Sequence, residues 1–269
     1  MNSTVFLTIA LFLLLGSLGL GQTTPSPVPQ KDLHVYLLIG QSNMAGRAPV
    51  GPKAAAELEG CFLLNEQDEW EPAQHPLNRY STIRKGLGMQ KLNPGSSFAQ
   101  TMKKAHPEAT IALVVNAKGG SKIEEWAPDT RFYRELIRRA RTAQESGTLK
   151  GVLWHQGESN SGKPASYLAR LEDLVKNLRQ DLGTPDLPFV AGQIKEGEAI
   201  NEEIAKLPRT VAHTGVASSK GLKTMDRWHF DAPSMSTLGE RYAAEMMRLQ
   251  KIQWRRGNLD RSGQQSRQR

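Results

Sequence analysis

Short apolar runs alternate with segments of helical periodicity along most of the chain. Five runs stay apolar without alternating polar positions, which is typical of strands covered on both faces: 34–39, 110–116, 151–155, 187–194 and 210–217. Four segments between or after them place apolar side chains at helical spacing: 96–105, 130–146, 164–182 and 234–251. Strands that alternate with helices indicate a parallel sheet with right-handed crossovers. We therefore predict an α/β fold, a three-layer α/β/α sandwich around a mostly parallel five-stranded sheet.

Residues 47–93 depart from this alternation. They hold a candidate hairpin, formed by residues 61–64 and Trp70, and otherwise read as one long excursion. Long loops in compact domains are often functional, so this segment is a candidate for substrate contacts.

The N-terminal end predicts export. Residues 5–20 form an apolar run, and Gly19 and Gly21 are small residues at the −3 and −1 positions of a cut after Gly21. The run is short for a membrane span, and we interpret residues 1–21 as a signal peptide. A Pro-rich linker follows at 22–30. Because no Lys or Arg precedes the apolar run, a retained anchor and a buried core helix stay open as alternatives.

Composition and charge refine this picture. A chain of 269 residues that is 38% hydrophobic suits one large domain, which we place at 31–252. The net charge is +8, and the tail at 253–269 carries five arginines against one acid, Asp260. Since no aromatic residues lie between the arginines at 255–269, we expect the tail to be disordered and solvated, with no nucleic-acid partner.

Cysteine and metal-ligand patterns add little to the predicted chemistry. The single cysteine, Cys61, allows no intramolecular disulfide. His, Cys and carboxylate residues show no metal-ligand spacing, so we expect neither a metal nor another cofactor. We expect the mature protein to be secreted or to lie in the cell envelope or periplasm, without stable membrane insertion. The sequence leaves its oligomeric state open.

Chemically unusual residues follow four of the strand-to-helix boundaries. These four blocks are Gly40-Gln41-Ser42-Asn43-Met44, Gly119-Gly120-Ser121, His155-Gln156-Gly157-Glu158-Ser159-Asn160 and Asp226-Arg227-Trp228-His229-Phe230-Asp231. Each alone has an ordinary explanation, such as a helix cap for the serine or a tight turn for the glycine pair. Ligands collect at the carboxyl ends of parallel strands, so the four blocks together predict one active site.

The residue types in these blocks fit nucleophilic catalysis. A serine hydroxyl needs a base to become a good nucleophile, and Ser42 and His229 supply that pair. Asp226 lies three residues before His229, near enough to fix the imidazole tautomer. The oxyanion that forms needs donors, for which the backbone amides of Ser42 and Gly120 and the side-chain amide of Gln156 are candidates.

The motif Gly-x-Ser-x-Gly is not met, because Met44 stands where the second glycine belongs. This argues against the nucleophile elbow of α/β-hydrolases. The four blocks instead resemble the SGNH hydrolase superfamily over about residues 33–248. More narrowly, they are similar to its sialate O-acetylesterase-like branch, which includes the acetyl xylan esterases of carbohydrate esterase family six.

The resemblance implies roles for individual residues. It makes Ser42 the nucleophile and aligns Asp226 and His229 with the family's final Asp-x-x-His. The glycine donor falls at Gly120 or Gly119, and the glutamine characteristic of this branch falls at Gln156. Glu158 is a second acid, which we expect to support Asp226 at His229; its acting in place of Asp226 stays open as an alternative. We also expect Gln41, Asn43 and His155 to contact substrate.

The function expected from these observations is a serine esterase that removes small acyl groups, with acetyl as the expected group, from carbohydrate through an acyl-enzyme intermediate. Its expected partner is an acetylated oligo- or polysaccharide. Two alternatives stay open. One is an esterase for lipid or thioester substrates, and the other is a non-catalytic polysaccharide-binding or envelope-associated module. The sequence does not identify the sugar or the position of the acetyl group.

Overall fold

The structure is a computed structural model that describes residues 33–52 and 57–266, with side chains as far as Lys251. Within these residues seven strands form one sheet in the order β3-β2-β4-β1-β5-β6-β7. Neighbouring strands pair in parallel, except that β2 and β3 form an antiparallel hairpin. The strands are β1 (Leu33–Gly40), β2 (Cys61–Leu64), β3 (Trp70–Pro72), β4 (Thr110–Ala117), β5 (Thr148–His155), β6 (Phe189–Gly192) and β7 (Thr214–Ala217).

Helices connect and follow these strands. The α-helices are α1 (Ser42–Ala45), α2 (Gly95–Ala105), α3 (Arg131–Gln144), α4 (Tyr167–Asp181), α5 (Ile200–Thr210) and α6 (Ala232–Ser266). Short 3-10 helices are η2 (Leu87–Met89), η3 (Ile123–Trp126), η4 (Glu158–Asn160) and η5 (Pro164–Ser166).

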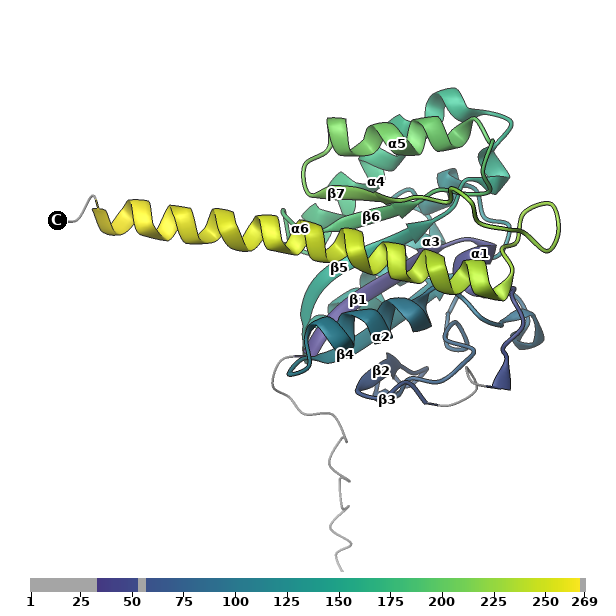
Figure 1. The fold of residues 1–269 in the computed structure, drawn as a ribbon, viewed down its shortest axis with the longest axis horizontal. Coiled ribbons are helices and arrows are strands. Elements are labelled where there is room, and N and C mark those ends of the chain that lie inside the picture. The colour runs from purple at the N-terminus through teal and green to yellow at the C-terminus, as the bar shows by residue number, and fades with distance from the viewer. Residues whose placement is uncertain (1–32, 53–56, 267–269) are drawn as a thin grey trace, which may run out of the picture.

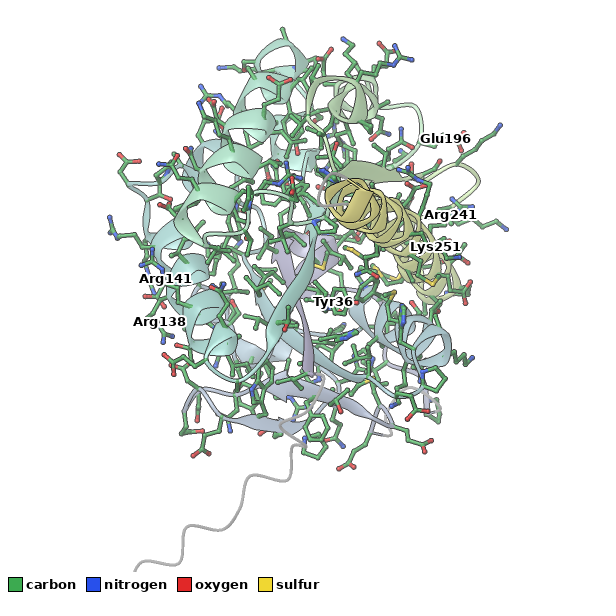
Figure 2. The ribbon with its side chains drawn as sticks, turned by 90° about the vertical axis from the view of Figure 1, so that its left-hand side faces the viewer. Tyr36, Arg138, Arg141, Glu196, Arg241 and Lys251 are labelled. Atoms are coloured by element: carbon green, nitrogen blue, oxygen red, sulfur yellow. The ribbon has the colours of Figure 1, made fainter. Side chains whose placement is uncertain are left out.

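The helices cover both faces of the sheet, and each face has its own apolar core. On one face, side chains of α3, α4 and α5 share one core with β1 side chains such as Val35 and Leu37. On the other, α1, α2 and α6 pack against Tyr36 and Leu38. Figure 2 shows these layers, with Arg138 of α3 on one side of the sheet. The alternating side chains of a fully buried strand thus divide between two cores.

This architecture confirms the predicted α/β/α sandwich and corrects its strand count. The five predicted strands correspond to β1, β4, β5, β6 and β7, and the candidate hairpin adds β2 and β3 to the edge of the same sheet. The predicted helices correspond to α2, α3, α4 and α6. The sequence prediction did not include α5, although Ile200, Ile204 and Leu207 have helical spacing and are buried.

The last helix is longer than the sequence predicted. α6 continues to Ser266, through a segment that we expected to be a disordered tail. Figure 1 shows this helix crossing one face of the sheet and continuing past its edge. The predicted signal peptide (1–21) and linker (22–30) lie outside the described residues. No helix within the described ranges combines the length and apolar character that crossing a membrane requires.

Candidate active site

The strand ends that carry the predicted blocks lie at one level of the sheet. Gly40, the last residue of β1, pairs with Ala117 of β4 on one side and His155 of β5 on the other. The amide of Gln41 donates to the carbonyl of His155 at 2.8 Å, and that of Lys118 donates to the carbonyl of Gly40 at 2.9 Å. The three central strands therefore deliver their following residues to the same edge.

Gly40 shows why a glycine precedes this block. Its φ is +130°, and a Cβ there would lie closer than 3.0 Å to the backbone of His155. An L side chain would meet both a steric and a conformational penalty at this position. Glycine lets β1 pass close to β5 and turn into α1, which begins with Ser42.

Ser42, His229 and Asp226 lie in hydrogen-bonding order. The Oγ of Ser42 is 3.0 Å from Nε2 of His229, and Nδ1 of His229 is 2.7 Å from Oδ2 of Asp226. With its proton on Nδ1, the imidazole donates to Asp226 and leaves Nε2 free to accept the serine proton. The structure thus brings together the three residues that the sequence placed in the triad.

Asp226 also organises the turn that carries His229. Its Oδ1 accepts hydrogen bonds from the backbone amides of Trp228 and His229, each at 2.8 Å. The partial burial of Asp226 would raise its pKa, but the hydrogen bonds from the His229 side chain and the two amides outweigh this and lower the pKa to about 2. Asp226 is therefore an ionised partner for His229 at neutral pH.

Asn43 joins the nucleophile block to the histidine turn. Its Nδ2 donates to the carbonyl of Trp228 at 3.0 Å, and its Oδ1 accepts from the amide of Phe230 at 3.2 Å. These two contacts lie on either side of His229. The remaining Nδ2 proton is donated to Oε1 of Glu158 at 2.7 Å. The side chain is fully buried, so the sequence-predicted substrate contact is instead a link between loops in this structure.

Glu158 lies behind this link. Its carboxyl group is almost completely buried, and burial raises its pKa to about 7, although hydrogen bonds from its backbone and Asn43 act in the opposite direction. Oε1 is 3.8 Å from Nε2 of His155. Within the described residues, the carboxylate hydrogen-bonded to His229 is that of Asp226, and Glu158 connects to the histidine turn through Asn43.

His155 and Gln41 are also enclosed by protein. His155 is fully buried; its Nδ1 is 3.1 Å from the hydroxyl of Tyr242, and burial lowers its pKa to about 3. The hydroxyl of Tyr242 donates to the carbonyl of Trp154, so it accepts the His155 Nδ1 proton. The Oε1 of Gln41 accepts a 3.0 Å hydrogen bond from Gln156. Neither residue presents its side chain to substrate in this structure.

Gln156 is committed to internal acceptors. Its Nε2 lies 3.0 Å from Oε1 of Gln41, 3.1 Å from the carbonyl of Ser121 and 2.7 Å from Oδ1 of Asn160. A primary amide has two hydrogens, so three protein acceptors leave none for an oxyanion. The geometry favours a role for Gln156 in bracing three loops over the predicted role as an oxyanion donor.

The glycine pair lies beside the nucleophile. The amide of Ser121 donates to the carbonyl of Lys118 at 3.2 Å, which closes a turn with Gly119 and Gly120 at its centre. Gly120 has a φ of +76°, as the third residue of a type II turn requires. A Cβ at Gly119 would lie 3.9 Å from the Cβ of Ser42. Of the two candidate glycines, the structure therefore shows Gly119 directly against the serine.

Sequence reasoning did not single out Arg47, which reaches the same place. A Cβ at Gly119 would overlap Nη2 of Arg47, and one at Gly120 would lie 3.7 Å from Nζ of Lys85. Both cations come from the long excursion between β1 and α2, where no periodic pattern marks functional positions. Among the described residues, no cluster of three or more His, Cys, Asp or Glu side chains could hold a metal ion.

The parallel α/β/α sandwich and the serine–histidine–aspartate arrangement at its strand ends define the class of protein as a hydrolase of SGNH type. Residues 32–248 match the family described as carbohydrate esterase, sialic acid-specific acetylesterase. The chain belongs to this family, and it is accordingly a carbohydrate esterase, a carboxylic ester hydrolase.

Individual relatives agree with this assignment. The chain is 30% identical over 250 residues to the Arabidopsis thaliana protein named "Probable carbohydrate esterase At4g34215", covering 83% of this chain and 94% of that one. The X-ray structure of the Arabidopsis protein AT4G34215 superposes with a TM-score of 0.71 at 28% identity, covering 80% of this chain and 97% of that one. A carbohydrate acetylesterase from Xanthomonas citri shares the fold, with a TM-score of 0.60 at 21% identity and coverage of 79% and 55%.

Proposed function

We propose that the protein hydrolyses small acyl esters of carbohydrate, with O-acetyl groups as the principal substrate, through a covalent acyl-enzyme. The observation that carries this proposal is the continuous hydrogen-bonded path from Ser42 Oγ through His229 to Asp226. Nε2 of His229 takes the hydroxyl proton as Oγ attacks the ester carbonyl, and the imidazolium then donates that proton to the departing sugar oxygen. Water, deprotonated by the same nitrogen, releases the acyl group and restores Ser42.

The tetrahedral intermediates need donors on the side of the glycine turn. The amides of Gly119 and Gly120 donate to no acceptor within the described part of the chain, and together with the amide of Ser42 they are our candidates for the oxyanion site. The placement of Gly119 against Ser42 supports this assignment. Gln156 would hold the turn in place through the carbonyl of Ser121.

Two observations support a small acyl group on a sugar. The family and its named relatives are carbohydrate esterases. Ser42 is only 6% exposed, which leaves limited room around the nucleophile for an acyl chain.

The test of the proposal is replacement of the nucleophile. Ser42→Ala removes one small hydroxyl, so the protein should fold normally while turnover of a chromogenic acetate falls by about 10⁴-fold or more. Thr237→Ala is a matched control, because it removes a helical hydroxyl whose exposed hydrogen bond goes to the carbonyl of Pro233 in the same helix. Acetate release by Ser42→Ala at the rate of the control would refute the serine mechanism.

The sugar is identified in a separate experiment, in which acetate release by the unmodified enzyme is measured on a panel of acetylated xylans, sialosides and algal polysaccharides.

We further propose that the protein is exported with cleavage after Gly21, on the strength of the apolar run and small residues at its N-terminal end. Mature protein recovered from the medium or envelope should begin at Gln22 when its N-terminus is sequenced. Intact chains beginning at Met1 in the membrane fraction would instead indicate a retained anchor.

A further inference from the structure

Arg47 holds a guanidinium group in a fixed orientation beside the nucleophile. Its Nη1 donates to the carbonyls of Gly46 and Met89, each at 2.7 Å. Within the residues that the structure describes, Nη2 donates to no protein acceptor and no carboxylate forms an ion pair with this arginine. One edge of the guanidinium is therefore fixed and the other is available.

The available edge faces the glycine turn. A Cβ placed on Gly119 would lie closer than 3.0 Å to Nη2 of Arg47 and 3.9 Å from the Cβ of Ser42. The arginine nitrogen and the serine carbon are thus less than about 7 Å apart, a separation at which two unit charges interact appreciably in a protein. Arg47 consequently lies on the side of Ser42 where we place the oxyanion.

The charge of Arg47 has no fixed counter-ion here. The side chain is half-buried, and this burial lowers its pKa from the usual value. Removing a cation from water without pairing it costs free energy, so such a group calls for an anionic partner. The neighbouring charge on Lys85 is also positive, and the carboxylate of Asp226 is occupied by His229.

The reaction itself supplies the missing anion. Attack of Ser42 on an ester converts the neutral carbonyl oxygen into an oxyanion, which exists in the tetrahedral intermediates and not in the bound ester. Gln156 has no amide hydrogen left to serve that oxyanion, as its three acceptors show. A preorganised cation near the glycine amides would stabilise the intermediate without strengthening binding of the ester.

We propose that the positive charge of Arg47 stabilises the oxyanion, as an electrostatic complement to the backbone amides of Ser42 and the glycine turn. This inference rests on the proposed serine mechanism and adds a residue to it. According to this inference, Arg47 stabilises the transient oxyanion of the reaction and does not bind a carboxylate group of an acidic sugar.

The test compares Arg47→Met, Arg47→Lys and the control Arg131→Met on a neutral chromogenic acetate. Arg131 is exposed and donates to the carbonyl of Thr82, so its loss removes one positive charge without removing a hydrogen bond of Arg47 or of the proposed triad. We expect Arg47→Met to lower kcat by about 10²-fold, the effect of one charge at this distance at an effective dielectric constant near 20, while KM changes little. Arg47→Lys should recover part of kcat, and the control should match the parent enzyme.

The affinity for a boronic acid provides a second measurement. If Arg47 had a purely structural role, its replacement would not weaken this affinity without also lowering the melting temperature. The adduct of a boronic acid with a serine is tetrahedral and negatively charged, so it resembles the intermediate. We expect Arg47→Met to weaken binding of phenylboronic acid by about the same factor as it lowers kcat/KM, at an unchanged melting temperature. A lower melting temperature with unchanged affinity of the folded fraction for the boronic acid would overturn the proposal.

Further outcomes distinguish failure of the proposed role of Arg47 from failure of the serine mechanism. If Arg47→Met leaves kcat on the neutral acetate unchanged and raises KM only for acetylated sugars bearing a carboxylate, the arginine binds ground-state substrate and the proposal is wrong. If Ser42→Ala is inactive while Arg47→Met retains full kcat, the serine mechanism stands and the role of Arg47 alone fails. Full activity of Ser42→Ala would remove the basis of both.

Discussion

At the scale of single residues, two carboxylates near the nucleophile differ because their surroundings differ. Asp226 is about half exposed and accepts three hydrogen bonds from its own turn, which hold its pKa at about 2. Glu158 is buried, and its pKa rises to about 7. Asp226 therefore stays ionised throughout the neutral range, while Glu158 changes charge within it. Only the first suits a permanent partner for an imidazolium.

This difference predicts unequal effects of removing the two charges. Asp226→Asn should lower kcat by about 10³–10⁴-fold, because the amide favours the histidine tautomer that cannot accept the proton of Ser42. Glu158→Gln retains an oxygen that can accept from Asn43, and should cost clearly less. Single-turnover rates of both variants, each normalised to active-site titration, make the comparison. A larger loss for a well-folded Glu158→Gln would reverse the assignment of the principal acid.

The raised pKa of Glu158 also predicts a pH dependence of stability. The pKa of a glutamate in the unfolded chain is about 4.3, whereas the pKa of Glu158 in the folded protein is about 7. The folded state therefore binds more protons between these values, so stability should fall as pH rises from about 4.5 to above 7. Glu158→Gln removes this contribution, and its melting temperature relative to the parent protein should rise across that interval. A difference that stays constant from pH 5 to pH 8.5 would contradict the buried titration.

Asp226 contributes to stability with the opposite sign. Its pKa is lower in the folded protein than in the unfolded chain, so its ionised form stabilises the fold above about pH 4. That contribution is lost as pH falls toward 2. Because Asp226 is largely exposed, solvent screening makes it a small term.

The proximity of Ser42, His229 and Asp226 was predictable because its signal in the sequence is local. Ser42 follows a strand directly, and Asp226 and His229 share one turn, so strand ends and short spacing were sufficient. The internal partners of Gln156 and Asn43 could not be predicted, because they include acceptors on loops that are distant in sequence, which no local pattern reports. Arg47 was missed for the same reason, since its nearness to Gly119 arises only when the long excursion folds back.

At the scale of elements, Asn43 connects α1 to the turn before α6. It makes backbone-like contacts to Trp228 and Phe230 and a third hydrogen bond to Glu158. The position of His229 relative to Ser42 thus depends on a side chain adjacent to the nucleophile. The link also explains how a buried acid that does not touch His229 can influence it.

We predict that Asn43→Ala destabilises the protein by about 2–4 kcal/mol, because it leaves a buried carboxyl group and two backbone groups without partners. Turnover per folded molecule should also fall, as His229 loses its restraint. In the double variant Asn43→Ala/Glu158→Gln, part of the stability should return at pH 8, where the parent Glu158 is ionised. Urea unfolding of the four proteins measures this coupling, and strictly additive effects would show that the two side chains act independently.

The strands that were predicted best are those covered by helices on both faces of the sheet. β4 is fully buried and β1 is buried except at His34, so their apolar runs were unambiguous. The β2–β3 hairpin was identified as a candidate without its place in the sheet, because β2 joins β4 through a parallel pairing that only the tertiary fold creates. The segment of α5 carried a usable helical pattern, although Pro208 near its end weakens that signal.

At the scale of the whole molecule, the packing of the final helix helps to set the geometry of the proposed triad. α6 follows the His229 turn and lies on the same face of the sheet as α2 (Figure 1). Ser42 follows the central strand β1, whereas His229 lies in the turn just before α6. The distance between Oγ and Nε2 is therefore set by helix packing as well as by the local turn.

Gly239 is where α6 comes closest to α2, and it provides a test of this dependence. A Cβ there would lie closer than 3.0 Å to Oγ of Ser97 and to the backbone of Pro94 and Phe98. Gly239→Ala gains about 1 kcal/mol of helix propensity, but forcing apart two packed backbones costs about 1–3 kcal/mol. Because the close atoms of Pro94 and Phe98 are backbone atoms, which cannot rotate away, we expect the cost to exceed the gain. We expect a lower urea midpoint and reduced kcat per folded molecule, because the start of α6 shifts with His229. Glu240→Ala, at the neighbouring exposed position of the same helix, is the control and should change neither quantity appreciably. A stabilised Gly239→Ala with parental kcat would show that α6 can move away from α2 without disturbing the triad.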